Sequence, residues 1–252
     1  HNSFEPEFVF NHSGVGLNVV GWFHGFLGVG ESARACVRAA RAANLPVEAV
    51  PLRLHLNGGQ SEELWKEPLH RNGFHPITVA HIDAPQADDL ARQHPVEMDA
   101  SRYRIGYWAW ELPEFPDRWI SFAERFDEIW APSEFCREAL ARKLPVPVLT
   151  MPHAIEIPDT GGDAMSARKR FGLPLEPFLF LFTFDFNSYA PRKNPEAVIE
   201  AYRRALDGDG SSPAMDGRPV GLVLKMHGGG YDPADRAALE SYRSTIAGLY
   251  VR

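Results

Sequence analysis

Residues 178–206 read FLFLFTFDFNSYAPRKNPEAVIEAYRRAL, and this stretch decides how the second half of the chain folds. Its opening run, 178–184, is apolar and too short for a comfortable helix, so it predicts a buried strand of a parallel sheet. Asn194 followed by Pro195 is typical of a helix start, with the asparagine as N-cap and the proline at the first helical position. The stretch therefore predicts a strand, a connecting segment and a helix.

The connecting segment, 185–193, is polar, and we expect a loop because Pro191 disfavours a helical conformation in the residue before it. The N-terminus of a helix that follows a buried parallel strand is a common anion site, since unpaired backbone N–H groups and the helix dipole converge there. Arg192 and Lys193 add two positive charges at this place. We therefore expect the segment to bind a diphosphate.

The composition of the 252-residue chain is that of a globular protein, and its net charge of −7 argues against non-specific nucleic-acid binding. No apolar run approaches the length of a membrane span, no cleavable signal is visible, and peripheral membrane association is not evident from the sequence. Cys36 and Cys136 lie far apart without metal-ligand spacing. This favours two buried thiols in a reducing, cytoplasmic compartment.

Predicted strands and helices alternate along the chain, which indicates right-handed β-α-β units and a doubly wound parallel sheet. The first domain, Rossmann-like over 1–157, has predicted strands at 17–23, 47–52, 77–82, 104–108, 128–131 and 146–151, and helices at 31–43, 86–93, 117–126 and 134–143. Residues 152–162 predict a connector. The second domain, 158–252, shows only two strands, at 178–184 and 220–226, and a last helix at 234–249. We expect it to be an incomplete Rossmann-like domain, since a doubly wound domain needs about four to six strands.

A glycine motif follows the first predicted strand, where residues 28–33 read GVGESA and match the dinucleotide-binding pattern G-x-G-x-x-A. However, Gly28 and Gly30 lie several residues beyond the strand, and the second strand ends at 51–53 without an acidic residue. Three alternatives stay open: a dinucleotide site, a flexible loop that faces a phosphate or a sugar, and a structural tight turn. Glu31 either contacts a substrate or stabilises the helix start by ~0.3–1 kcal/mol through the helix dipole.

The segment 108–116, WAWELPEFP, follows the predicted fourth strand. In open α/β sheets the ligand crevice lies beyond the carboxyl ends of the strands. Trp108, Trp110 and Glu111 at this place are able to stack on a sugar and hydrogen-bond its hydroxyl groups. The alternative is that both tryptophans belong to the core and that Glu111 is a solvated loop residue.

Histidines mark three further positions. His81 and Asp83 alternate at the end of the third strand, and we expect a hydrogen-bonded pair there, because two ligands are too few for a metal site. His153 opens the connector and is a cleft candidate by its position. His227 ends the second strand of the second domain, where either a nucleotide or a plain loop would lie. No metal site is predicted.

Four segments, in this order, resemble the GT-B glycosyltransferases, and a bacterial subgroup of the retaining glycosyltransferase family 4 in particular. They are FLGVGESAR at 26–34, GYWAWELPEFPDRW at 106–119 followed by FDEIWAPSEFCREAL at 126–140, MPHAIEI at 151–157, and FTFDFNSYAPRKNPEAVIEAYRRA at 182–205. The resemblance implies a hexosyltransferase that moves a sugar from a nucleotide-diphosphate sugar to a saccharide or lipid-linked acceptor with retention of configuration. The donor is its substrate, and no cofactor or metal is implied.

The resemblance also implies roles for individual residues. Lys193 matches the lysine that binds the donor diphosphate, and Asn187 stands where the family has an arginine, so that Arg192 would compensate. Gly28 and Gly30 match the loop that closes over the diphosphate. The family's N-terminal histidine falls at about Trp110, beside Glu111, and these two are the catalytic candidates. Further substrate contacts are expected from Glu31, His153 and His227.

One departure bears on activity. The family's paired glutamates, on a helix late in the second domain, have no counterpart in 1–252, so we expect weak donor binding by this chain. The first alternative is therefore a non-catalytic binding or assembly protein that retains the GT-B frame. A nicotinamide-dependent oxidoreductase is the second, and it rests on the glycine motif alone.

Overall fold

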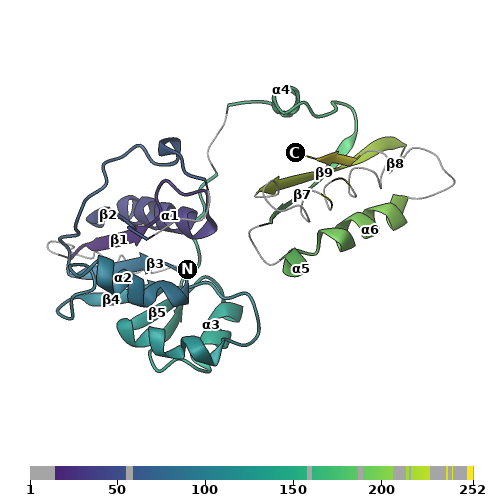
Figure 1. Ribbon diagram of the computed structural model, residues 1–252. Helices are drawn as coiled ribbons and strands as arrows, with labels where there is room; N and C mark the ends of the chain where they lie inside the picture. The colour runs from purple at the N-terminus through teal and green to yellow at the C-terminus, as the bar shows by residue number, and fades with distance from the viewer. Residues whose placement is uncertain are drawn as a thin grey trace, which may run out of the picture. The chain divides into compact units, whose positions relative to one another are not determined.

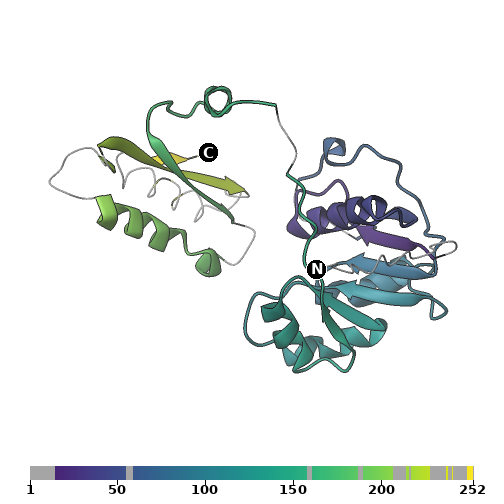
Figure 2. The same ribbon diagram turned by 180° about the vertical axis from the view of Figure 1, so that it is seen from behind.

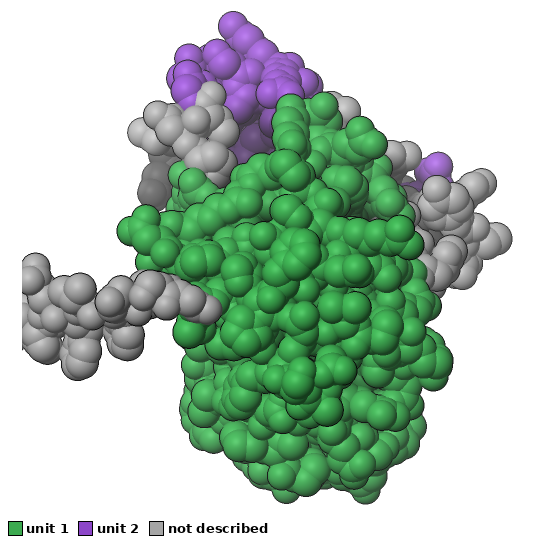
Figure 3. Space-filling view, turned by 90° about the vertical axis from the view of Figure 1, so that its left-hand side faces the viewer, with its two compact units in different colours: residues 1–157 green, residues 158–252 purple. Residues whose placement is uncertain are grey.

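The computed structural model describes residues 15–54, 59–157, 161–186, 190–206, 214–215, 217–227, 237, 240 and 249–251. The chain divides into two compact units, unit 1 over 1–157 and unit 2 over 158–252 (Figure 3). No helix in these described ranges has both the length and the apolar character needed to cross a membrane.

Unit 1 is built on a six-stranded parallel sheet with the strand order β2-β1-β3-β4-β5-β6 (Figure 1). Its strands are β1 (Leu17–Gly21), β2 (Val47–Pro51), β3 (Ile77–His81), β4 (Tyr103–Tyr107), β5 (Glu128–Ala131) and β6 (Val148–Thr150). The central strands are short and rich in β-branched residues buried on both faces, as helix-covered parallel sheets require. The predicted parallel α/β sheet is confirmed.

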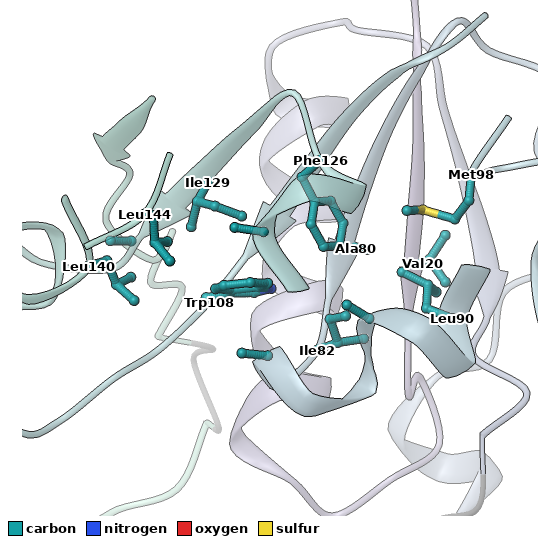
Figure 4. Close-up of a cluster of buried hydrophobic side chains, with 14 of the residues drawn as sticks. Val20, Ala80, Ile82, Leu90, Met98, Trp108, Phe126, Ile129, Leu140 and Leu144 are labelled. Carbon is teal, nitrogen blue, oxygen red and sulfur yellow. The ribbon is translucent and has the colours of Figure 1, made fainter. Parts of the chain in front are cut away.

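Helices cover the two faces of this sheet (Figures 1 and 2). On one face, α1 (Gly28–Ala42) packs on β1, β2 and β3, and Val37 meets Val19 and Ala49 in a buried cluster. The other face carries α2 (Ala87–Gln93), η3 (Asp117–Arg125) and α3 (Glu134–Ala141). The larger core lies beneath them, and Figure 4 shows Trp108 and Ile82 within it. Full burial of a large apolar side chain contributes about 1.5–3 kcal/mol.

Two predicted helices of unit 1 differ in detail from the structure. Helix α1 starts at Gly28 rather than at residue 31, because the Glu31 N–H already bonds the Leu27 carbonyl at 3.0 Å and nothing in the glycine motif obstructs a helical turn. The segment expected as a helix at 117–126 is the 3-10 helix η3, in which the Trp119 N–H bonds the Pro116 carbonyl three residues back. Its aromatic side chains are poor α-helix formers and pack against the core.

Unit 2 has a smaller sheet in the order β10-β9-β7, with all three strands parallel. The described elements are α4 (Ala164–Arg170), β7 (Phe178–Asp185), α5 (Ala190–Lys193), α6 (Pro195–Leu206), β8 (Ala214–Met215), β9 (Arg218–His227) and β10 (Leu249–Val251). β8 pairs antiparallel with β9. β8 and β10 correct the expectation of two strands, while the helix predicted at 234–249 lies largely outside the described residues.

Strand β7 is present as predicted, but the prediction that it is buried is wrong. Phe178, Phe180 and Leu181 are 49%, 41% and 65% exposed. The reason is its place in the sheet, since β7 is the edge strand of the described part and pairs with β9 on one side. Its carboxyl end reaches the core, where Phe184 packs with Ile199 of α6.

Candidate functional site

The strand order of unit 1 creates a switch point between β1 and β3. From β1 the chain continues to β2 on one side, and β3 and the later strands lie on the other. In open parallel sheets, ligands bind beyond the carboxyl ends of the strands at such a point. Four polar side chains from separate segments meet there, and we call them the hydroxyl–imidazole cluster: Ser32, His81, Tyr107 and His153.

Hydrogen bonds connect the four members of the cluster. Ser32 Oγ lies 2.8 Å from His81 Nδ1 and 3.2 Å from His153 Nδ1. The Tyr107 hydroxyl donates to the Met151 carbonyl at 2.7 Å, and its oxygen lies 3.0 Å from His153 Nδ1. The Tyr107 ring also stacks on both imidazoles, with centroid distances of 4.6 Å to His81 and 5.3 Å to His153.

The cluster is uncharged near neutral pH. Burial, and secondly the neighbouring His153, lower the pKa of His81 to about 3. Desolvation also lowers the pKa of His153, although this residue is exposed as a whole. Burial is the main cause that raises the pKa of Tyr107 to about 12. Neutral donors and acceptors of this kind match the hydroxyl groups of a polyol better than they match a free ion.

Local packing explains how Ser32 reaches His81. His81 is the last residue of β3, and Ser32 lies on the buried side of the first turns of α1. The helix lies close to the sheet beside Ser32. This is possible because Gly21 of β1 has no side chain, and a Cβ at that position would stand 2.4 Å from the Ala33 Cβ. The alanine of the G-x-G-x-x-A motif therefore serves helix–strand packing.

The two glycines of the motif differ in their surroundings. A Cβ on Gly30 would stand 2.6 Å from the Trp22 carbonyl oxygen, whereas a Cβ on Gly28 would meet no atom within 4 Å. Both residues belong to the first turn of α1 rather than to a loop before it. Gly30 thus has a structural reason to be glycine, and Gly28 has none in the described surroundings. A contact of either glycine with a diphosphate stays a prediction.

Glu31 is held by two arginines at the start of α1. Its carboxylate accepts hydrogen bonds from Arg34 Nε at 2.7 Å and from Arg38 Nη2 at 2.6 Å. Desolvation opposes ionisation, but the bonds from Arg38 and Arg34 outweigh it and hold the pKa of Glu31 below its usual value. Arg34 is almost fully buried and also donates to the Phe23 and Gly25 carbonyls. This arrangement fixes the β1–α1 connection, and a substrate contact of Glu31 stays a prediction.

Trp108 and Trp110 both take part in packing. Trp108 is buried and stacks on Phe115 within the large core. Trp110 is partly buried, meets Phe115 and Trp119 edge-on, and donates from Nε1 to the Glu114 carbonyl at 2.8 Å. The Trp110 ring therefore holds the 110–119 loop in its conformation. Its proposed catalytic role stays a prediction.

Glu111 is exposed and electrostatically close to Asp83. Desolvation of the Asp83 carboxyl group and, secondly, the Glu111 carboxylate raise the pKa of Asp83, although that residue is exposed as a whole. The expected hydrogen bond between His81 and Asp83 is not formed. His81 Nδ1 bonds Ser32 instead, and its buried Nε2 has no hydrogen-bond partner in the described part of the chain. The cause is that β3 ends at His81, so the strand alternation does not extend to Asp83.

In unit 2, the basic segment follows β7 as predicted, but it is not a loop throughout. Residues 190–193 form the short helix α5, with Pro191 in its first turn, where a proline is tolerated. Arg192 and Lys193 are half-buried at its end. Asn194 has a φ of 49° and its side chain accepts from the Ala197 N–H at 3.3 Å, so it ends α5 and caps α6.

Two site residues predicted in unit 2 fall wholly or partly outside the described part of the chain. Asn187 lies outside the described residues, and so does the side chain of His227. The backbone of His227 closes β9 and stands opposite Asp185 of β7 in the parallel register. Their roles in donor binding stay predictions.

Ser32 and Tyr107 are site residues that were not predicted from the sequence. Tyr107 ends β4 next to the strand that His81 ends, and the two are register partners. Polar residues at the carboxyl ends of neighbouring parallel strands are a usable signal for such a site. Ser32 carries a weaker signal, since it is a polar residue on the buried side of an alanine-rich helix.

Among the described residues, no group of three or more His, Cys, Asp or Glu side chains is placed to hold a metal ion. Cys36 and Cys136 are free thiols, and burial raises the pKa of Cys36 to about 11. Comparison with protein-family models and with curated protein sequences finds no match for this chain.

Proposed function

We propose that the chain belongs to a nucleotide-sugar-dependent glycosyltransferase, in which unit 2 binds the donor diphosphate and unit 1 binds the hydroxyl-bearing acceptor. The observation that carries the proposal is the basic turn of unit 2. Arg192 and Lys193 follow the carboxyl end of β7 and directly precede the Asn194-capped helix α6. Two cations beside the N-terminus of a helix suit a diphosphate leaving group, whose charge grows as the sugar departs.

Unit 1 supports the acceptor side of the proposal. The hydroxyl–imidazole cluster lies at the switch point of the parallel sheet and offers uncharged hydrogen-bonding groups. Such groups fit sugar hydroxyls, which are themselves neutral donors and acceptors. Retention of configuration, the GT-B arrangement and Glu111 with Trp110 as catalytic residues form part of the proposal through the family resemblance.

Calorimetric titration of the chain with UDP, GDP and NAD tests the donor side. We expect UDP or GDP to bind weakly, and Lys193→Ala to reduce the affinity about tenfold or more, since a charged hydrogen bond contributes roughly 1.5–3 kcal/mol. The matched control is Lys169→Ala, which removes an exposed lysine from α4 of the same unit. It is expected to leave nucleotide binding unchanged.

The same titration separates the alternatives. If neither UDP nor GDP binds, the transferase proposal fails for this chain and a non-catalytic binding or assembly role is favoured. Saturable NAD binding that survives Lys193→Ala would instead favour the oxidoreductase. Equal losses in the Lys193 and Lys169 variants would show that general charge, and not the basic turn, attracts the nucleotide.

A further inference from the structure

The proton positions in the hydroxyl–imidazole cluster follow from its geometry. A carbonyl oxygen cannot donate, so the Tyr107 hydroxyl proton must point at the Met151 carbonyl, 2.7 Å away. The Tyr107 oxygen can then only accept at its second contact, 3.0 Å from His153 Nδ1. His153 Nδ1 must therefore carry a hydrogen. In the neutral ring, this leaves Nε2 as a bare acceptor.

Ser32 extends the same reasoning to His81. The His153 Nδ1–H also faces Ser32 Oγ at 3.2 Å, so Ser32 keeps its own proton, and we assign this proton to the shorter contact with His81 Nδ1 at 2.8 Å rather than to the neighbouring Tyr107 hydroxyl. His81 is then the Nε2–H tautomer. The residue is 1% exposed, and its Nε2 finds no partner among the described residues. Within the described residues, the network therefore satisfies both contacts of His153 Nδ1 and leaves the His81 Nε2 without a hydrogen-bond partner.

The two ends of this network differ in access. His81 is enclosed, whereas His153 is exposed and its contacts with described residues all involve Nδ1 or the ring face. We propose that Tyr107 and Ser32 lock His153 in the Nδ1–H tautomer, and that its bare Nε2 accepts a hydrogen bond from a hydroxyl group of a sugar ligand. This inference rests on the proposed function, and it assigns the acceptor-binding contact. Tyr107 and Ser32 are positioning residues, because they act through His153.

Nitrogen-15 NMR of the histidine rings in the full 252-residue chain reads the tautomer directly. We expect His153 to show a protonated Nδ1 and a bare Nε2. Tyr107→Phe removes the oxygen that requires this tautomer, and it should shift the equilibrium toward Nε2–H, further in the double variant with Ser32→Ala. The matched control is Tyr103→Phe at the opposite end of β4, whose hydroxyl bonds Glu128 at 2.9 Å. It should leave the His153 signals unchanged.

The ligand is tested with methyl glycosides of glucose, galactose and mannose and with N-acetylglucosamine, followed by the His153 ring resonances. We expect saturable shifts with at least one of these sugars and none with its permethylated form, which keeps the oxygens but donates no hydrogen bond. Tyr107→Phe should weaken binding roughly fivefold, the effect of one neutral hydrogen bond. Tyr103→Phe should not.

The results also separate this inference from the proposed function. A His153 found as the Nε2–H tautomer in the unmodified chain overturns the inference, whatever the nucleotides do. Failure of every free sugar to shift His153, or equal binding of the permethylated sugar, overturns the acceptor contact even if the tautomer is as expected. Failure of nucleotide binding alone overturns the transferase and leaves the tautomer and the sugar contact standing.

Discussion

The two glycines of the 28–33 motif offer the sharpest test of how unit 1 is built, because the same substitution should have opposite effects at the two positions. In Gly30→Ala, the new methyl group would stand 2.6 Å from the Trp22 carbonyl and 3.2 Å from the Gly25 carbonyl, both backbone atoms. In Gly28→Ala it would meet no atom of the described residues within 4 Å. Both residues are in the first turn of α1, so the gain in helix propensity from glycine to alanine is similar at the two positions.

The magnitudes follow from these contacts. Overpacking against a fixed backbone destabilises a protein by about 1–3 kcal/mol, and Arg34 holds the affected carbonyls in place because it donates to both the Trp22 and the Gly25 carbonyl. Gly30→Ala should therefore lower the free energy of unfolding of unit 1 by about that amount. Gly28→Ala should raise it by up to about 0.5 kcal/mol, because alanine reduces the freedom of the unfolded chain.

Tryptophan fluorescence during urea unfolding measures unit 1 selectively, since all 6 tryptophans lie between residues 22 and 130. A neutral Gly30→Ala, or a Gly28→Ala that destabilises as strongly as Gly30→Ala, would refute the steric reasoning. Nucleotide titration of the same two variants then reports on function. Loss of binding in a stable Gly28→Ala protein would support the predicted role of this position over the diphosphate.

Further predictions concern charged groups of unit 1. Arg34→Met leaves buried carbonyls without donors and should destabilise unit 1 by roughly 2–4 kcal/mol in the fluorescence assay. Arg38 is partly exposed, so Arg38→Met should lower the free energy of unfolding by less than about 1 kcal/mol. Equal effects of the two substitutions would contradict this prediction. Hydrogen bonds from Arg137 and then Thr150 lower the pKa of Glu134 to about 2 from 4.5. Its contribution to stability should be complete above pH 4.5 and decline as the pH falls toward 2. Carbon-13 NMR should place the Glu134 midpoint near 2, and Arg137→Met should raise it; a midpoint near 4.5 in the unmodified chain would refute the pairing.

Features that depend on a few neighbouring residues could be predicted well. Ser133 caps α3 by accepting from the Cys136 N–H, and Asn194 caps α6 by accepting from the Ala197 N–H. Each cap joins residues only three positions apart, so it depends on local sequence alone. The strands of unit 1 were also predictable, since apolar runs of that length are buried wherever helices cover both sheet faces. Pro191 misled the prediction because a proline blocks a helix interior but fits the first turn of α5.

Burial and exposure across the chain were predictable only in part. The sequence of β7 resembles that of a central strand, yet its exposed Phe180 and Leu181 reflect the edge position in the described sheet. From the sequence, the Trp110 ring is equally suited to contact a ligand or to pack within the loop. In the folded chain it packs against Phe115 and Trp119, which lie within reach of it. Such outcomes depend on which segments become neighbours, and composition does not contain that information.

The sequence by itself determined the parallel α/β architecture, the helix caps and the position of the basic turn, because propensity, capping and hydrophobic periodicity act over a few residues. Only the tertiary structure decided that Ser32 meets His153, 121 residues away, beside His81 and Tyr107. The physical reason is that strand order and the close approach of α1 to Gly21 bring four distant side chains within hydrogen-bonding distance. The local sequence around each of these four residues does not indicate which of the other three it will contact.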